Sequence, residues 1–372
     1  MLMTKSSNKF CKSLIFFIFL FFMKQSTKVA VIFNEAHPEF YIKTNRSELK
    51  ELDFTPFFEV EDYTPIEEYE QLAKRLTNSD FYAYSLNIKD NLYILLDDLE
   101  NNKPDVIFNF VELFKDNNRL EMNIVGLFEL FGIPYTGAPP MALANCQDKV
   151  FTKKLLNAAG IKTPKFHLIK NIQKNYRSDL NFPIIVKPAF EDASVGIEND
   201  SIVLNTKQLK NRVEFVLSYF AQPVLLEQYV EGRELNVAVL GDKNLEVLPI
   251  SEIDFSKMPN HLFNIVSYQA KWDPLHEAYH KTIPHCPAIL PPKIEKKAKE
   301  IAITAFRTMG CRDYARVDMR LDKNNELYVL EVNPNPDLTE SAGFMRSAEA
   351  AGLSYEETLQ KIISLALQRG KK

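Results

Sequence analysis

Two stretches near the end of the chain decide the fold: residues 314–319, which read YARVDM, and residues 326–332, which read ELYVLEV. Both are rich in β-branched and aromatic residues, which favour β-strands. Residues 322–325 between them, DKNN, have the polar composition of a tight turn. Together the three segments predict an antiparallel β-hairpin.

Polar side chains in this hairpin are spaced to meet on one surface. Side chains two residues apart leave the same face of a strand, which groups Arg316 with Asp318 and Glu331 with Asn333. Carboxylate and amide oxygens suit Mg²⁺, and an arginine beside them can hold an oxyanion. A solvated face with surface salt bridges is the commoner fate of such residues. The apolar surroundings favour a metal or phosphate site, because burial of unpaired charge would be costly.

The rest of the chain alternates short β-rich runs with helical periods, which indicates α/β layering. Asp148 is a good N-cap type, and Gly132, Gly160 and Gly310 each follow a helical pattern where a helix would end. We expect helices at residues 121–131, 148–159 and 294–309, and strands at residues 29–33, 106–110, 183–187, 224–229, 234–240 and 246–253.

The composition is that of an ordinary globular protein. The 372 residues carry 45 Lys and Arg against 49 Asp and Glu, a net charge of −4, so no basic excess indicates nucleic-acid binding. At roughly 150 residues per domain, this length predicts two or three domains. The cysteines form no C-x-x-C pair, which argues against a disulfide framework or a zinc site: Cys11, Cys146, Cys286 and Cys311.

The first 22 residues differ from the rest. Three lysines precede an apolar run at residues 14–22, as in a signal peptide, but no small-x-small cleavage site follows. The run is also too short to span a bilayer. We expect translation to begin at Met23, the protein to be cytoplasmic, and no membrane to be involved.

The hairpin motifs have a counterpart in a known family. Residues 314–319, residues 330–333 (LEVN) and residues 351–355 (AGLSY) resemble the C-terminal domain of D-alanine–D-alanine ligases, which belong to the ATP-grasp superfamily. Matching motifs continue upstream in the family's order, and the resemblance covers about residue 105 to the C-terminus. These are residues 132–137 (GIPYTG), 147–149 (QDK), 186–188 (VKP) and 227–234 (EQYVEGRE).

The resemblance implies an α/β (α+β) architecture, the ATP-grasp fold, with three subdomains and the nucleotide between the central and C-terminal ones. After the extension at residues 1–22, we expect an N-terminal α/β domain at residues 23–144. The central ATP-grasp subdomain would cover residues 145–233, and the C-terminal domain with the metal site residues 234–372.

The resemblance also assigns the nucleotide-binding residues. It implies that Lys149 and Lys187 bind phosphate, that Glu227 and the backbone of Val230 contact adenine, and that Glu234 binds ribose. A lysine is a point-charge partner for phosphate, which agrees with the first of these roles.

The reacting centre follows from the same resemblance. Lys271 would reach the γ-phosphate of ATP, and Arg316 would stabilise an acyl phosphate and the later oxyanion. Asp318, Glu331 and Asn333 would bind Mg²⁺, for which Mn²⁺ could substitute.

The implied activity is that of an ATP-dependent carboxylate–amine ligase acting on small-molecule substrates, amino acids or small peptides. A ligase with a hydroxyl or thiol acceptor stays open as an alternative. A non-catalytic ATP-binding regulatory module is a further alternative, which broken metal ligands would have favoured. The apolar stretch at residues 124–131 suits either the core or a homodimer interface.

Several positions depart from the family pattern on the substrate side. Ala193 and Ala342 stand where the family has serines, Trp272 where it has a tyrosine, and Asp337 where it has a glycine. Losing a hydroxyl that binds a carboxylate costs about 1.5–3 kcal/mol, enough to change the preferred substrate. We therefore expect ATP use to be retained and substrate choice to be altered, so that D-alanine itself stays an open question.

An acidic pair, Glu191 and Asp192, occupies the loop after Lys187. These carboxylates would repel the phosphates unless Mg²⁺ or a lysine compensates.

Overall fold

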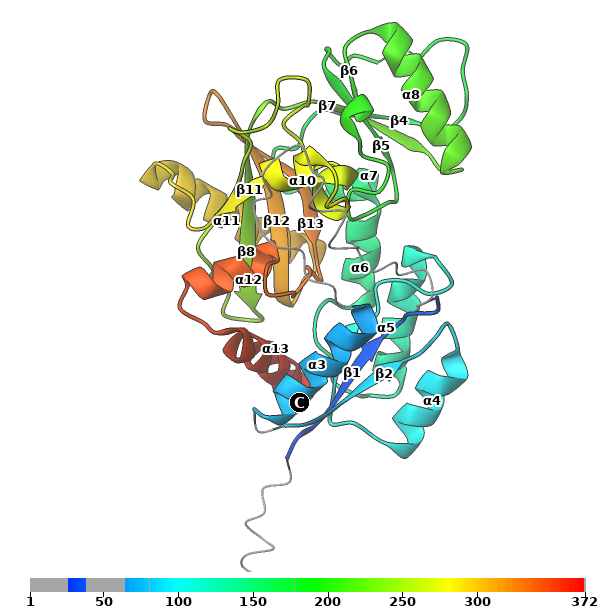
Figure 1. The fold of residues 1–372 in the computed structure, drawn as a ribbon, viewed down its shortest axis with the longest axis vertical. Helices are drawn as coiled ribbons and strands as arrows, with labels where there is room; N and C mark the ends of the chain where they lie inside the picture. Colours follow the sequence, from blue (N-terminus) through cyan, green and yellow to red (C-terminus); the bar gives the residue numbers. More distant parts are fainter. Residues whose placement is uncertain (1–25, 38–63, 80, 177, 371–372) are drawn as a thin grey trace, which may run out of the picture.

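The computed structural model describes residues 26–37, 64–79, 81–176 and 178–370. The apolar segment at residues 1–22 and the predicted start at Met23 lie outside the described residues. Within the described ranges the chain forms three β-sheets, which Figure 1 shows as separate layers joined by helices. No helix in these ranges is both long enough and apolar enough to cross a membrane.

The first sheet is parallel, with the strand order β2-β1-β3. Its core is formed by apolar side chains of β1 and β3 and of the helices beside them. In the predicted helix at residues 121–131, Ile124 and Phe128 belong to this core, whereas Leu130 is 81% exposed. The elements are β1 (Lys28–Phe33), α3 (Pro65–Thr77), β2 (Tyr82–Asn87), α4 (Leu92–Asn101), β3 (Val106–Phe110), η2 (Asn118–Leu120) and α5 (Glu121–Leu130).

Two helices connect this sheet to the rest of the molecule. The first, α6 (Pro140–Gln147), was not predicted and spans the expected domain boundary at residues 144–145, which stays a prediction. The second, α7 (Lys149–Ala158), begins as predicted, because the Asp148 side chain accepts hydrogen bonds from the backbone N–H groups of Val150 and Phe151.

The second sheet is antiparallel, with the order β4-β7-β5-β6, and α8 packs on it (Figure 1). Apolar residues of β5, β7 and α8 fill its core. The elements are β4 (Phe166–Ile169), β5 (Ile184–Pro188), η3 (Asn199–Ser201), β6 (Ile202–Val203), α8 (Thr206–Tyr219) and β7 (Val224–Gln228).

The third sheet is the largest, with the order β11-β10-β8-β12-β13 and β9 paired with β8. Helix α11 covers one face, and Gly310 ends it in the left-handed conformation. On the other side, α12 and α13 join this sheet to the first one in a shared core. The elements are β8 (Gly232–Gly241), β9 (Glu246–Val247), β10 (Ser251–Asp254), α9 (Tyr268–Trp272), α10 (Glu277–Lys281), β11 (Ile283–His285), α11 (Pro292–Met309), β12 (Asp313–Asp322), β13 (Leu327–Asn333), α12 (Gly343–Ala350) and α13 (Tyr355–Gly370).

The predicted single strand at residues 246–253 is wrong, since the structure divides it into β9 and β10. Pro249 lies between the two and has no N–H to donate to a ladder, which explains the break. The predicted hairpin is confirmed as β12 and β13, with Asp318 opposite Glu331 and Arg316 opposite Asn333.

Candidate functional site

Asp318 is the centre of a hydrogen-bonded cluster on the hairpin. Its Oδ1 accepts from Nε of Arg316 and Nδ2 of Asn236, each at 2.8 Å. Its Oδ2 accepts from Nη2 of Arg316 at 2.8 Å and from Nδ2 of Asn333 at 2.9 Å. Asp318 is only 6% exposed, so these donors compensate for the lost hydration of the carboxylate. Asn236, on β8, was not predicted.

Glu331 joins this cluster through Asn333, whose Nδ2 lies 3.4 Å from Oε1 of Glu331. The three predicted metal ligands are therefore neighbours, two carboxylates and one amide. Nowhere in the described ranges do three or more His, Cys, Asp or Glu side chains gather as a metal-binding group.

Lys149 connects the hairpin to the loop after β5. Its Nζ lies 3.6 Å from Oε2 of Glu331 and 3.0 Å from Oδ1 of Asp192. Burial alone would raise the pKa of Glu331, but Lys149 and Lys187 overcome this effect and hold it at about 2. Asp192 therefore has its lysine partner, and Glu191 accepts a 2.6 Å hydrogen bond from Gln222.

Two lysines share one buried carboxylate next to this position. Glu227, 2% exposed, forms an ion pair with Nζ of Lys153 at 2.6 Å and accepts a hydrogen bond from Nζ of Lys187 at 3.0 Å. Burial acts to raise the pKa of Glu227, but the two lysines bring it below its ordinary value. Lys153 was not predicted. Its spacing of four residues from Lys149 places both on one face of α7, which is the signal that could have found it.

The predicted adenine and ribose contacts lie around the connection between β7 and β8. Val230 is in the connecting loop, and Glu234 is the third residue of β8. Oε2 of Glu234 pairs with Nη2 of Arg320 at 2.8 Å. Burial raises the pKa of Glu234, an effect that Arg320 opposes.

Lys271, on α9, has different surroundings from the other predicted lysines. Its Nζ lies 4.8 Å from the ring centroid of Trp272, and within the described ranges it has no carboxylate within ion-pair distance. Burial and the charge of Arg316 lower the pKa of Lys271. Glu112, which follows β3 and is exposed, also faces this region: desolvation raises its pKa to about 7, helped by Asp337 and opposed by Lys271.

Two of the departures from the family pattern contact each other. Nε1 of Trp272 donates a 2.9 Å hydrogen bond to the backbone oxygen of Ala193. The loop after β5 is thereby tied to α9, next to Lys271, which the separate sequence positions could not indicate.

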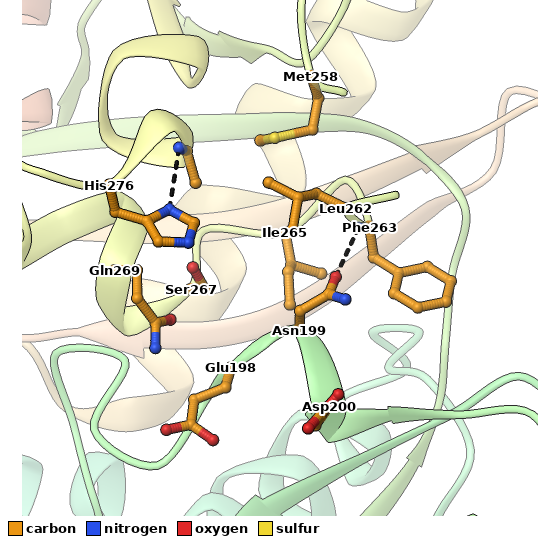
Figure 2. Close-up of a pocket in the computed structure, with 11 residues that line it drawn as sticks. Glu198, Asn199, Asp200, Met258, Leu262, Phe263, Ile265, Ser267, Gln269 and His276 are labelled. Carbon is orange, nitrogen blue, oxygen red and sulfur yellow. Dashed lines mark hydrogen bonds between the residues drawn. The ribbon is translucent and has the colours of Figure 1, made fainter. Parts of the chain in front are cut away.

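A hollow of about 320 Å³ lies between η3 and residues 258–278, and Figure 2 shows that both polar and apolar side chains line it. Its side chains hold the backbone around them: His276 Nδ1 accepts from the N–H of Ala278, and Asn199 Oδ1 accepts from the N–H of Phe263. None of the predicted site residues lines this hollow. The candidate site is therefore the cluster between β5, α7, α9 and the hairpin, and not this cavity.

The sequence matches the model of the family described as D-ala D-ala ligase C-terminus over residues 155–364. An uncharacterised protein, y4sG of Sinorhizobium fredii, is 33% identical over 71% of this chain and 75% of its own length. A D-alanine–D-alanine ligase of Carboxydothermus hydrogenoformans is 36% identical over 67% of this chain and 78% of its own.

Solved structures share the fold. A D-alanine–D-alanine ligase from Bacillus anthracis complexed with ATP superposes with a TM-score of 0.67 at 22% identity, covering 93% of this chain and 99% of that one. The VanG D-Ala:D-Ser ligase from Enterococcus faecalis gives a TM-score of 0.64 at 22% identity, over 92% and 100% of the two chains.

The fold and the family match together define the class: this is an ATP-grasp protein, a ligase of the type that forms carbon–nitrogen bonds. More narrowly, the chain belongs to the D-alanine–D-alanine ligase family through its C-terminal domain.

Proposed function

We propose that the protein joins the carboxylate of one amino acid or small peptide to the amine of another, using ATP and passing through an acyl phosphate. The observation that carries this proposal is the cluster in which Lys149 and Lys187 converge with Glu331 beside Asp318 and Arg316. Cationic and oxygen-donor groups of this kind suit a triphosphate and its divalent cation. One structural neighbour, the D-alanine–D-alanine ligase from Bacillus anthracis, is complexed with ATP.

The residues fit a magnesium ion in chemistry. Asp318, Glu331 and Asn333 supply hard oxygen donors, and the low pKa of Glu331 keeps its carboxylate charged at neutral pH. Both oxygens of Asp318 accept hydrogen bonds from arginine and amide donors, so metal binding would exchange some of these bonds. When bound, Mg²⁺ or Mn²⁺ would supply neutralisation of the phosphate charge.

The chain's own groups would then position the reactants. Lys149 and Lys187 would hold phosphate oxygens, and Glu227, shared by Lys153 and Lys187, would fix one of these ammonium groups. Glu227 and the backbone of Val230 would contact adenine, and Glu234 would bind the ribose. Lys271 and Arg316 would neutralise the charge that develops at the transferred phosphoryl group and at the tetrahedral oxyanion.

Amine-dependent release of phosphate from ATP tests the function. The purified protein is assayed with Mg²⁺ over a panel of D- and L-amino acids and dipeptides, with hydroxy acids and thiols as competing acceptors. The proposal expects release only with certain carboxylate and amine pairs, together with an amide product. ATP binding without release for any pair would instead support a regulatory module, and release with hydroxy acids or thiols alone would support the other acceptor chemistry. Whether the protein works as a homodimer stays a prediction.

A further inference from the structure

The hollow between η3 and residues 258–278 has the size of a small-ligand site. Its volume of about 320 Å³ lies at the lower end of the range for such sites. One wall consists of η3 and of Glu198 just before it, and the other is the segment that contains α9 and leads into α10 (Figure 2). The side chains of Met258, Leu262 and Ile265 make its interior partly apolar. Polar groups around an apolar interior are typical of a site for a small organic molecule.

The wall at η3 is built around a buried arginine. Arg212, on α8 and 8% exposed, donates from Nη2 to the backbone oxygen of Gly196 and to Oγ of Ser201, both at 2.9 Å. Its Nη1 pairs with Oε2 of Glu198 at 2.9 Å, which balances the charge of that carboxylate. Asp200 in the same wall makes no hydrogen bond or ion pair within the described ranges. This wall therefore presents one net negative charge, at Asp200.

The opposite wall carries neutral hydrogen-bond donors. Nδ1 of His276 accepts from the backbone N–H of Ala278, so the proton of the neutral ring lies on Nε2. Oγ of Ser267, 6% exposed, accepts from the N–H of Ala270, which leaves its O–H as a donor. The Gln269 side chain makes no hydrogen bond in the part of the chain that the structure describes, so its NH₂ group is a third donor. Donors grouped in this way suit a carboxylate.

We propose that this hollow binds a free α-amino acid with an apolar side chain as an effector, at a place separate from the reacting substrates. The ammonium group of the amino acid pairs with Asp200, and its carboxylate accepts hydrogen bonds from the donors of the opposite wall. Its side chain packs against Leu262 and Ile265. A simple amine or a simple acid satisfies only one of the two walls, so the zwitterion is preferred to either.

A bound amino acid acts on the candidate site because both walls continue into it. The loop after β5, which contains Asp192, leads into η3, and Gln269 lies on α9 two residues before Lys271. The N–H of Tyr268 already donates to the backbone oxygen of Ile197 at 2.7 Å and joins the two segments. A ligand that contacts both walls adds a second link and favours the arrangement in which the loop lies against α9. This regulatory effect rests on the proposed function, whereas the binding itself does not.

Calorimetric titration of the full chain tests the binding. The probes are L-leucine and D-leucine, with isopentylamine and isocaproate as the compounds that lack the carboxylate or the ammonium group. At least one leucine enantiomer binds about 10- to 100-fold more tightly than either compound, because each lacks one charged hydrogen-bond partner. Asp200→Asn and Gln269→Leu both weaken leucine binding, and Arg316→Met in the candidate site does not.

The matched control for the calorimetry is Glu214→Gln, which removes a carboxylate of α8 that pairs only loosely with Lys210 and lies outside the hollow. It keeps the affinity for leucine. Equal affinity for leucine and isopentylamine overturns the inference. Leucine affinity that is unchanged in both Asp200→Asn and Gln269→Leu overturns it as well.

A kinetic experiment separates this inference from the proposed function. With a reacting pair other than leucine, leucine lowers the KM of the reacting amino acid about fivefold or more. Asp200→Asn abolishes this effect and leaves turnover without leucine unchanged. Leucine binding without any change in KM contradicts the effector role. If no pair reacts while leucine still binds and Asp200→Asn weakens it, the proposed function is contradicted and the site is supported.

Discussion

The two sides of the candidate site differ in whether their charged side chains have ion-pair partners. On the side of β5, α7 and β7, which we call the paired side, the predicted phosphate lysines are paired with carboxylates: Lys149 with Asp192 and Glu331, and Lys187 with Glu227. We call the side of α9 and α12 the unpaired side. On the side of α9 and α12, Lys271 and Arg346 have no carboxylate within ion-pair distance in the described ranges, and burial lowers both pKa values.

The difference shows on which side the charged groups already have partners before a ligand binds. Paired charges are held in place by the fold and are costly to remove one at a time. Unpaired charges persist in a stable protein where a ligand supplies the missing partner, which is common at functional sites. Of the four departures from the family pattern, Trp272, Asp337 and Ala342 fall on the unpaired side, and Ala193 lies in the loop after β5, where its backbone oxygen accepts a hydrogen bond from Trp272.

The substitution Glu331→Gln tests the paired side most directly, because it removes the charge of one carboxylate. The amide cannot act as an anionic metal ligand or balance Lys149, so amine-dependent phosphate release should fall by about 100-fold or more. Glu326→Gln is the matched control, because Glu326 lies just before the same strand and pairs with Lys162 at the surface. Full turnover in Glu331→Gln would show that the metal assignment is wrong.

Lys153→Met tests whether the pairing also stabilises the fold. Lys153 is 1% exposed and its loss leaves Glu227 with Lys187 alone, so the free energy of unfolding should fall by about 2–4 kcal/mol. Urea unfolding measures it. Lys162, whose side chain is 59% exposed, pairs with Glu326 at the surface. Lys162→Met should therefore lower the free energy of unfolding by less than about 1 kcal/mol. Equal losses in the two variants would contradict the distinction between buried and surface pairs.

Glu112→Gln gives the smallest effect, on the unpaired side. The native pKa of about 7 lies above the ordinary value of 4.5, so between these pH values the folded state binds more protons than the unfolded state. Ionisation of Glu112 therefore destabilises the folded state progressively as the pH rises through this window, and by the full amount above it. Because the Glu112 side chain is exposed, solvent screens most of this cost, so Glu112→Gln should raise Tm by no more than about 2 °C at pH 8 and leave it unchanged near pH 4. A lower Tm at pH 8 would mean that the carboxylate is stabilising there.

The sequence predicted local features well. The hairpin, the Asp148 cap and the Gly310 stop follow from patterns within a few residues, and each is present. The prediction of one strand at residues 246–253 failed because Pro249 interrupts the ladder. Many further elements were not predicted, among them α3, β2, α4, α6, α8, α12 and α13.

Contacts between segments far apart in the chain could not be predicted from the sequence. The pairing of Lys153 with Glu227, and the meeting of Arg346 with Arg316 above Gly343, depend on how α7 and α12 pack against the sheets. Spacing along one chain carries no direct signal for such contacts. The individual roles of the predicted site residues stay predictions until they are tested.

We infer that the paired side, with the carboxylates and amide of the hairpin, binds the triphosphate of ATP through a divalent cation. Calorimetric titration of the purified protein with ATP, with Mg²⁺ and then with EDTA, tests it most directly. Removal of the cation should weaken ATP binding at least about tenfold, a loss of about 1.4 kcal/mol, and Arg346→Met should leave the Mg²⁺-dependent affinity unchanged. Equal affinity with and without the cation would contradict it.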